Sequence, residues 1–362
     1  MNARIGSLAL TFQQRTGDIT LLMRHLLSSI TPETLYKYNA CWVKFKLWLY
    51  PETLAVVDDM VVCLYVSHLI GLAVDHSTGH QAIDNAMSAI AFYFGLMGRV
   101  SPTHSLLCTR LRLTAKRVLS ASKSTCEAIT AAELHAVLVF HLTAACSLRI
   151  RMHLTVFLLM FVGLLRYDDA ACILVHADLL QFISVSRADS RDDGIVLFLH
   201  SSKTDQTGDG AWVAIGATRG RFCPVRLLRE LLQLGGYVRD HPSEDVGPLL
   251  RGVKLCYRPH KHHILQQLTS PFSQPIPALS YASFLVSIQH LVAEAGVSKH
   301  VGLHAGRSGG ASTAASVGIN PQSVCGLGRW KMGNTFADTY VNMIDGNARK
   351  YFDITRRLWP FA

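Results

Sequence analysis

The most informative stretch of the 362-residue sequence places a histidine and an arginine three positions apart, at His304 and Arg307. On a helix this spacing is one turn, which aligns both side chains toward one point. Small residues follow the pair, and such a helix start lets another backbone or a phosphate approach closely. A guanidinium stays ionised and presents a planar fork of donors that matches phosphate. The pair therefore suggests phosphate chemistry, but a His-x-x-Arg pair alone has a high false-positive rate.

Four further residues of suitable chemistry flank this pair. Arg166 ends an apolar helix, Lys203 lies beside a polar turn, and Trp330 and Tyr340 follow downstream. Each has an ordinary structural explanation when taken alone. Arg166 would cap its helix or pair with one of the two aspartates that follow it, Lys203 would be an exposed turn lysine, and Trp330 a core aromatic. Only the ordered set favours a catalytic site.

In order and spacing these residues resemble the tyrosine recombinase superfamily, also called phage integrases. The motifs of that family run Arg, Lys, His-x-x-Arg, His or Trp, then Tyr, and all six positions are filled here. The sequences from Arg307 to Ala311 and from Gly328 to Trp330 are most similar to those of recombinases of eukaryotic mobile elements of the Crypton and DIRS-like kinds. Trp330 precedes Tyr340 by ten residues, where the family commonly has about nine.

The resemblance implies a reversible transesterification of DNA that needs neither a metal nor another cofactor. Tyr340 would attack the phosphodiester and form a 3′-phosphotyrosine link while Arg166 and Arg307 hold the nonbridging oxygens. His304 would help to activate a phenol whose ordinary pKa is near 10, and Lys203 would protonate the leaving 5′ oxygen.

Two residues near these motifs have other expected roles. Asp169 lies three positions after Arg166, where the family usually has an acidic residue, and is expected to orient rather than react. Tyr351 competes with Tyr340 as nucleophile, but Lys350 and Phe352 flank it, and we interpret it as a packing residue of the C-terminal tail.

Composition supports a globular protein with an anionic partner. Of the residues, 49% are hydrophobic and 17% are charged, and the net charge is +10. The resemblance implies double-stranded DNA as the partner, bound by a homotetramer on two sites, and the positive charge favours such an anionic partner. Nine scattered cysteines without a Cys-x-x-Cys pair indicate an intracellular protein, in the nucleus of a eukaryotic host and otherwise in the cytoplasm. We expect no export signal, because charged and polar residues interrupt the apolar residues of the stretch 1–22. We expect no membrane partner, because the apolar run 154–165 is far shorter than the roughly 20 residues that span a bilayer.

Hydrophobic periodicity predicts a mostly α-helical chain with a small β-hairpin. Thr31 and Pro32 begin a helix with an aromatic core face, and helical segments follow at about 56–72, 80–97, 104–120, 131–145 and 153–165. Strands are expected at 195–199 and 212–215, around the turn 204–210. The resemblance assigns 1–123 to a helical core-binding (SAM-like) domain, 124–130 to a linker and 131–362 to an integrase-type catalytic domain.

The helix at 104–120 is a candidate DNA-binding element. Leu107, Leu111 and Val118 form its predicted apolar stripe, and four basic residues flank that stripe, Arg112 and Lys116 along one edge and Arg110 and Arg117 along the other. A solvated helix face is the alternative. Lys and Arg exceed Asp and Glu by 12 to 7 in residues 1–125 and by 23 to 18 in the remainder, so that each part carries +5. We therefore expect both domains to clamp the duplex.

Two further features have competing interpretations. The tail, helical from Asn347 to Leu358 and ending in Trp359, Pro360 and Phe361, is expected to dock on a neighbouring subunit, or else to pack on its own domain. A second group, Cys256 with His260, His262 and His263, invites a zinc site, but no second cysteine lies nearby and a polar loop is preferred.

The leading functional hypothesis is an active recombinase or integrase encoded by, or derived from, a mobile element. The alternative is a domesticated DNA-binding protein of the same fold that has lost turnover. A type IB topoisomerase is a mechanistic relative.

Overall fold

The computed structural model describes most of the chain, in the ranges 24–27, 29–119, 126–184, 193–200, 209–237, 247–256, 262–265, 276–330 and 348–361, together with residue 21. Contacts divide the chain into two compact units, Met1–Ser124 and Thr125–Ala362. The division falls at the start of the expected linker 124–130.

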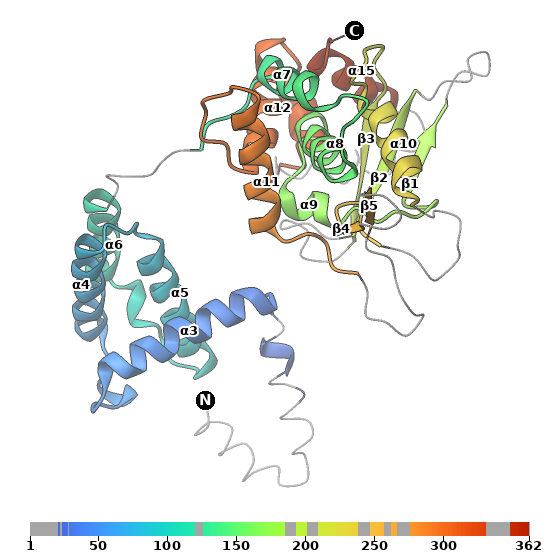
Figure 1. Cartoon of the computed structure of the whole chain (residues 1–362). Helices are drawn as coiled ribbons and strands as arrows, with labels where there is room; N and C mark the ends of the chain where they lie inside the picture. Colours follow the sequence, from blue (N-terminus) through green and yellow to red (C-terminus); the bar gives the residue numbers. More distant parts are fainter. Residues whose placement is uncertain are drawn as a thin grey trace. The chain divides into compact units, whose positions relative to one another are not determined.

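The secondary structure described in the first unit is entirely helical (Figure 1). Its elements are α3 (Pro32–Leu49), a 3-10 turn (Leu54–Val56), α4 (Asp59–Asp75), α5 (Gln81–Leu96), a second 3-10 turn (Pro102–His104) and α6 (Leu106–Val118). As predicted, Thr31 caps α3 by accepting from the backbone N of Thr34, with proline at the first position. Trp42, Phe45 and Leu49 enter the core.

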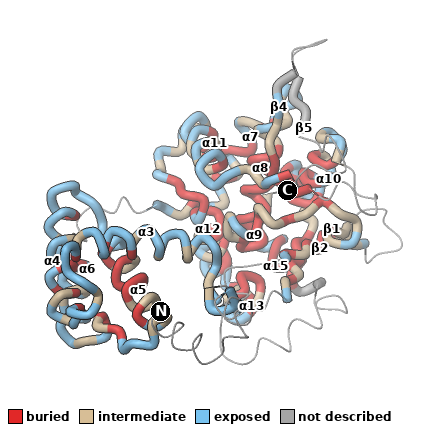
Figure 2. Tube along the Cα trace, turned by 90° about the horizontal axis from the view of Figure 1, so that it is seen from below, coloured by how far each residue is buried: buried red, intermediate tan, exposed pale blue. Residues whose placement is uncertain are grey.

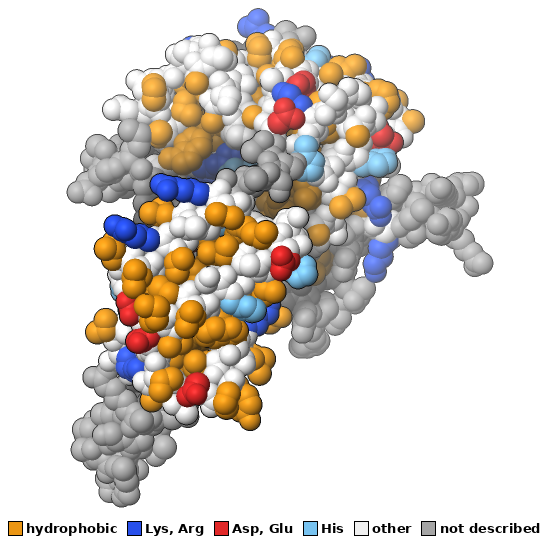
Figure 3. All heavy atoms as spheres, turned by 90° about the vertical axis from the view of Figure 1, so that its left-hand side faces the viewer, with side chains coloured by type: hydrophobic (Ala, Val, Ile, Leu, Met, Phe, Trp, Pro, Cys, Tyr) orange, Lys and Arg blue, Asp and Glu red, His pale blue; other side chains and the backbone are white. Residues whose placement is uncertain are grey.

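The predicted apolar stripe of α6 is wrong at two of its three positions, while the third, Leu111, packs against the core. Leu107 and Val118 are 47% and 51% exposed, and the helix instead buries Cys108 and Ala115. These small residues let α6 pack closely on α4, where the sulfur of Cys108 lies 3.6 Å from that of Cys63. Apolar side chains consequently appear on the face of this unit seen in the lower part of Figure 3.

The second unit combines helices with small antiparallel sheets. Its helices are α7 (Ala131–His141), α8 (Leu148–Val162), α9 (Tyr167–Ala171), α10 (Pro224–Gly235), α11 (Tyr281–Glu294), α12 (His304–Ser316), α13 (Pro321–Gly328) and α15 (Ala348–Leu358). The central helix α8 is buried without interruption from Met152 to Val162 (Figure 2), which confirms the buried helix predicted from the apolar run. No described helix is long and apolar enough to cross a membrane.

A three-stranded sheet lies beside these helices, in the order β1 (Leu180–Ile183), β2 (Gly194–Leu199), β3 (Ala211–Gly216). The β2–β3 pair is the predicted hairpin, with Ile195 opposite Ile215. A separate pair, β4 (Val253–Cys256) and β5 (His262–Leu265), was not predicted. The expectation of a mostly helical chain with a small sheet is confirmed.

The C-terminal helix α15 packs on this sheet within its own unit. The Phe352 ring fills the space above Gly194, and the Thr355 hydroxyl accepts a hydrogen bond of 3.0 Å from the backbone N of Gly216. Trp359 is fully buried and donates to the carbonyl oxygen of Phe222 at 3.0 Å. Docking on another subunit was expected because aromatic residues at the end of the tail were taken to be exposed. Trp359 is buried instead, so this basis is wrong, and the tail packs on its own unit, as the alternative stated. Tyr351 is buried, as its interpretation as a packing residue required.

Candidate active site

Arg307 lies in the first turn of α12, which packs closely on α8. A Cβ atom at Gly310 would overlap the carbonyl oxygen of Phe161, and one at Gly309 would overlap that of Ile129. At these two positions the small residues thus accommodate the backbone of the same chain rather than a phosphate. This close contact fixes the point from which the Arg307 side chain extends.

The Arg307 guanidinium bridges the C-terminal ends of two helices. Nη1 donates to the carbonyl oxygen of Leu164, just past α8, and Nη2 donates to that of Gly328, the last residue of α13, at 2.5 Å. Helix C-termini carry partial negative charge, so both contacts stabilise the buried cation. The guanidinium carbon also lies 4.3 Å from the centre of the Trp330 ring.

Arg166 begins α9 and is held through its backbone. Its N–H donates to Oδ2 of Asp169 at 2.8 Å, and Asp169 is fully buried. No described residue accepts a hydrogen bond from Nη1 of Arg166, although this atom is buried. The interpretation of Arg166 as the cap of α8 is therefore wrong, because Arg307 contacts the carbonyl at that end. Asp169 thus contacts the Arg166 backbone, and its expected role, to orient rather than to react, stays a prediction.

Arg329, which the sequence analysis did not single out, is the third arginine of the cluster. Its Nη2 donates to Oδ2 of Asp169 at 2.6 Å, and the residue is 4% exposed. Its Nε and Nη1 have no hydrogen-bond partner in the described part of the chain. A charged residue inside the small and apolar run from Val324 to Trp330 was the available signal.

The cluster is strongly cationic. Burial, together with the charges of Arg166 and Arg329, lowers the pKa of Arg307 to about 10, and Asp169 acts in the opposite direction. Arg307 remains ionised at neutral pH. Three guanidiniums and one carboxylate give these four groups a net charge of 3 − 1 = +2, which suits a dianionic or developing negative charge.

The remaining predicted residues divide into two groups. His304 is the first residue of α12, exposed and one turn before Arg307, and Trp330 is half-buried against Arg307. Lys203 and Tyr340 lie outside the described residues, as do the turn 204–208 and the side chains of the Cys256 and histidine group. Among the described residues, no group of His, Cys, Asp and Glu could hold a metal ion.

The four basic residues of α6 differ in their surroundings. Arg112 forms an ion pair with Asp84 of α5, and the Lys116 Nζ lies 4.0 Å from the same carboxylate. Arg110 and Arg117 are exposed. The edge of α6 that carries Arg112 and Lys116 thus contacts α5 within the same unit.

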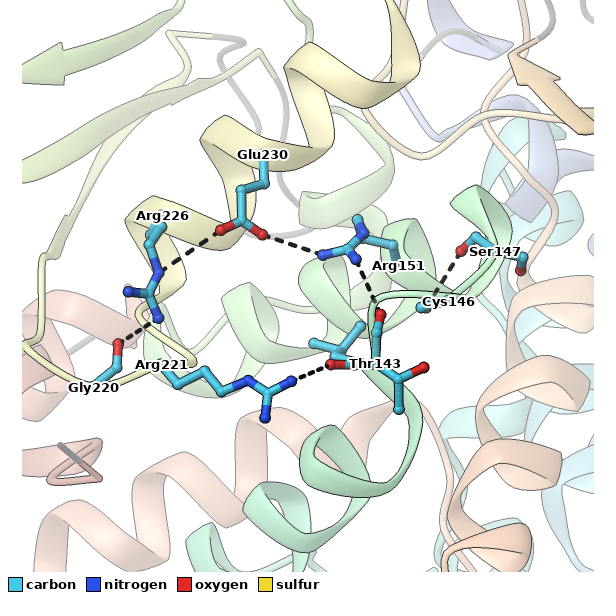
Figure 4. A network of polar contacts seen from close by, with 9 residues as sticks. Thr143, Cys146, Ser147, Arg151, Gly220, Arg221, Arg226 and Glu230 are labelled. Carbon is cyan, nitrogen blue, oxygen red and sulfur yellow. Dashed lines mark hydrogen bonds and ion pairs between the residues drawn. The ribbon is translucent and has the colours of Figure 1, made fainter.

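A second arginine cluster lies at the opposite, N-terminal end of α8 (Figure 4). Arg151 and Arg226 approach Glu230 from two sides, at 3.2 and 3.8 Å. Arg221 donates to the carbonyl oxygen of Leu142 at 3.0 Å, and Arg226 to that of Gly220 at 2.9 Å. Because α8 has 15 residues, it separates the two clusters by about 22 Å.

Neither a protein-family model nor a curated protein matches the sequence. Solved structures match the fold. The XerH site-specific recombinase, in a post-cleavage complex with a palindromic difH substrate, aligns with a TM-score of 0.53 at 13% identity, over 89% of this chain and 77% of that one. The Tn1549 transposon integrase bound to transposon right end DNA aligns with a TM-score of 0.48 at 14% identity, over 95% and 96%. A lambda integrase dimer on a COC′ core site aligns at 0.45 and 16% identity, over 90% and 73%. With the helical first unit and the mixed second unit described above, this chain has the tyrosine recombinase fold.

Proposed function

We propose that this protein is a site-specific DNA recombinase that cuts and rejoins DNA through a 3′-phosphotyrosine intermediate. The observation that carries the proposal is the buried cluster with a net charge of +2, in which the Nη1 donor of Arg166 lacks a described partner. Buried donors without partners are costly unless a ligand uses them. A phosphodiester is a ligand with matching charge and geometry.

In the proposed reaction, the Tyr340 phenolic oxygen forms a bond to phosphorus as the bond from phosphorus to the 5′ oxygen breaks. The phenol proton passes to His304, and Lys203 protonates the departing 5′ oxygen. Arg166 and Arg307 stabilise the charge that develops on the nonbridging oxygens. The products are a phosphotyrosine and a free 5′-hydroxyl, and the reverse reaction rejoins the strand without ATP, a metal or another cofactor.

The finer assignments extend this proposal. The enzyme would act as a homotetramer on two double-stranded sites, encoded by or derived from a mobile element of the Crypton or DIRS-like kind, in the nucleus of a eukaryotic host or otherwise in the cytoplasm. Both units would contact the duplex, the first through Arg110, Arg112, Lys116 and Arg117. A second unit that alone bound a duplex as tightly as the whole chain would contradict the two-unit clamp.

The decisive experiment compares Tyr340→Phe with Tyr351→Phe on a nicked suicide duplex, in which the covalent adduct accumulates. Tyr340→Phe should abolish the protease-sensitive adduct and retain noncovalent binding, because only the attacking oxygen is removed. Tyr351→Phe should retain the adduct, since the buried Tyr351 side chain extends from α15 and packs near Gly326 of α13.

The opposite pattern would move the nucleophile to Tyr351. Binding without an adduct in the unsubstituted protein would instead favour the domesticated DNA-binding protein. Supercoil relaxation without recombination between two sites would favour a topoisomerase.

A further inference from the structure

Among the described contacts of the Asp169 carboxylate, the one with Arg329 is the closest. The Arg329 Nη2 lies 2.6 Å from Asp169 Oδ2, within hydrogen-bond range, whereas the Arg307 Nη1 lies 4.0 Å from the same oxygen. The Arg166 backbone donates to that oxygen, but its guanidinium forms no described ion pair with it. Asp169 therefore pairs with the arginine that belongs to none of the recognised motif positions.

The backbone at Arg329 is unfavourable for an arginine. Arg329 has φ of +54°, in the left-handed region that usually holds glycine after a helix. For other residues this conformation costs roughly 1–2 kcal/mol. Of the three described non-glycine residues with positive φ, Leu164 (+49°) and Arg329 both flank Arg307, and the third is Ser77. At Arg329 this conformation directs the side chain toward Asp169, and at Leu164 it directs the carbonyl oxygen toward Arg307. The strained residues are therefore the ones that make the contacts of the cluster.

The charges around the Asp169–Arg329 ion pair indicate its effect on the cluster. Asp169 is needed to hold the Arg166 backbone, but a bare carboxylate among Arg166 and Arg307 would attract their guanidiniums and compete with a phosphate. A third guanidinium bonded to Asp169 removes that competition. We propose that Arg329 is a positioning residue: it neutralises Asp169, so that Arg166 and Arg307 keep their charge for the DNA phosphate. This inference rests on the proposed function.

A charge-rescue experiment on the full-length chain tests the inference. Arg329→Gln lowers the net charge of the four groups from +2 to +1 and frees Asp169 to bind the other arginines. Covalent capture of the suicide duplex should slow on the order of ten- to a hundredfold, while duplex affinity stays within about twofold because Arg329 is buried. Adding Asp169→Asn restores +2, and the double variant should cut at least about fivefold faster than Arg329→Gln alone.

Two further variants serve as controls. Arg226→Gln also removes one arginine from an ion pair, but at the exposed cluster, and should leave capture within about twofold. Arg329→Lys keeps the charge without the planar fork and should fall between the unsubstituted chain and Arg329→Gln. A double variant that cuts no faster than Arg329→Gln would overturn the proposal, because a purely structural Arg329 would give additive losses.

Urea unfolding of the unsubstituted chain, Asp169→Asn, Arg329→Gln and the double variant decides the pairing without any cleavage. If Asp169 and Arg329 are partners, the double variant should lose less stability than the sum of the two single losses. Additive losses would overturn the pairing. If the unsubstituted chain formed no adduct on any duplex, the proposed function would fail, and this cycle would still report on Arg329.

Discussion

The two ends of α8 carry arginine clusters of similar composition and opposite environment. At the N-terminal end, Arg226 and Glu230 have side chains 46% and 42% exposed, although that of Arg151 is 12% exposed, and Arg226 also donates to a backbone carbonyl oxygen. At the C-terminal end, Arg307 and Asp169 are 2% and 0% exposed. An exposed arginine cluster needs no ligand, because solvent satisfies and screens it. A buried cluster with surplus charge and unpartnered donors requires a compensating group, and this difference distinguishes a candidate active site from an ordinary surface network.

Replacing the carboxylate of each cluster should reveal the largest difference in stability between the two clusters. Asp169→Asn leaves three buried guanidiniums without a counter-charge, and we expect the free energy of unfolding to fall by about 3–5 kcal/mol. Glu230→Gln, at the exposed cluster, should cost less than about 1 kcal/mol. Urea denaturation of the full chain measures both. Equal losses would show that burial does not separate the clusters.

Conservative exchange of one arginine in each cluster tests function rather than stability. Arg307→Lys keeps a cation but loses one of the two contacts that bridge Leu164 and Gly328, and should slow covalent capture of the suicide duplex about 10²–10³-fold. Arg221→Lys removes a guanidinium that donates to the Leu142 carbonyl and lies 5.2 Å from the centre of the Phe222 ring, and should leave capture nearly unchanged. A strong effect of Arg221→Lys would assign the N-terminal cluster a role in the reaction.

A smaller effect is expected at His153, which lies on α8 between the clusters and has no carboxylate partner among the described residues. Burial, with a contribution from Arg149, lowers the pKa of His153 to about 4, from an ordinary value near 6.5. Between these values the unfolded chain takes up a proton that the folded chain does not. Stability should therefore fall as the pH drops from about 6.5 to 4, by at most about 3 kcal/mol from this group.

The control for His153 compares two substitutions by urea unfolding across that pH window. His153→Phe should flatten the acid slope, because no group remains to be protonated inside the core. His290→Leu, which changes a side chain 70% exposed, should leave the slope intact. An unchanged slope in His153→Phe would show that the burial of His153 does not govern acid stability.

Local signals predicted much of the fold. Thr31 and Pro32 correctly placed the start of α3, and the apolar run placed α8, because caps and buried helices are encoded within a few neighbouring residues. Helix α10 carried comparable signals, proline at its first position and the left-handed Gly236 after its end, and could have been predicted. Strand β1 could not, because four residues become a strand only through pairing with β2.

The candidate site was predictable to the extent that its residues follow known motif order. Arg166, Arg307 and Trp330 were found in this way, and the structure brings them around one cluster. The contact of Arg329 with Asp169 was not accessible from sequence, since the two residues are 160 positions apart. The α6 stripe failed at two of its three positions because close packing on α4 favours small residues over large apolar ones.

The close backbone contacts of two α12 glycines, with Ile129 and with Phe161 of α8, have a consequence for mutational scanning. An alanine at Gly309 or Gly310 would add one methyl group where a carbonyl oxygen of the same chain already lies. The helix would have to shift, and Arg307 would move with it, although misplacement by about 1 Å can cost a hundredfold in rate. A scan scored by activity alone would thus rank two residues that never meet the substrate beside those that do, whereas a parallel scan for protein abundance would separate the two classes.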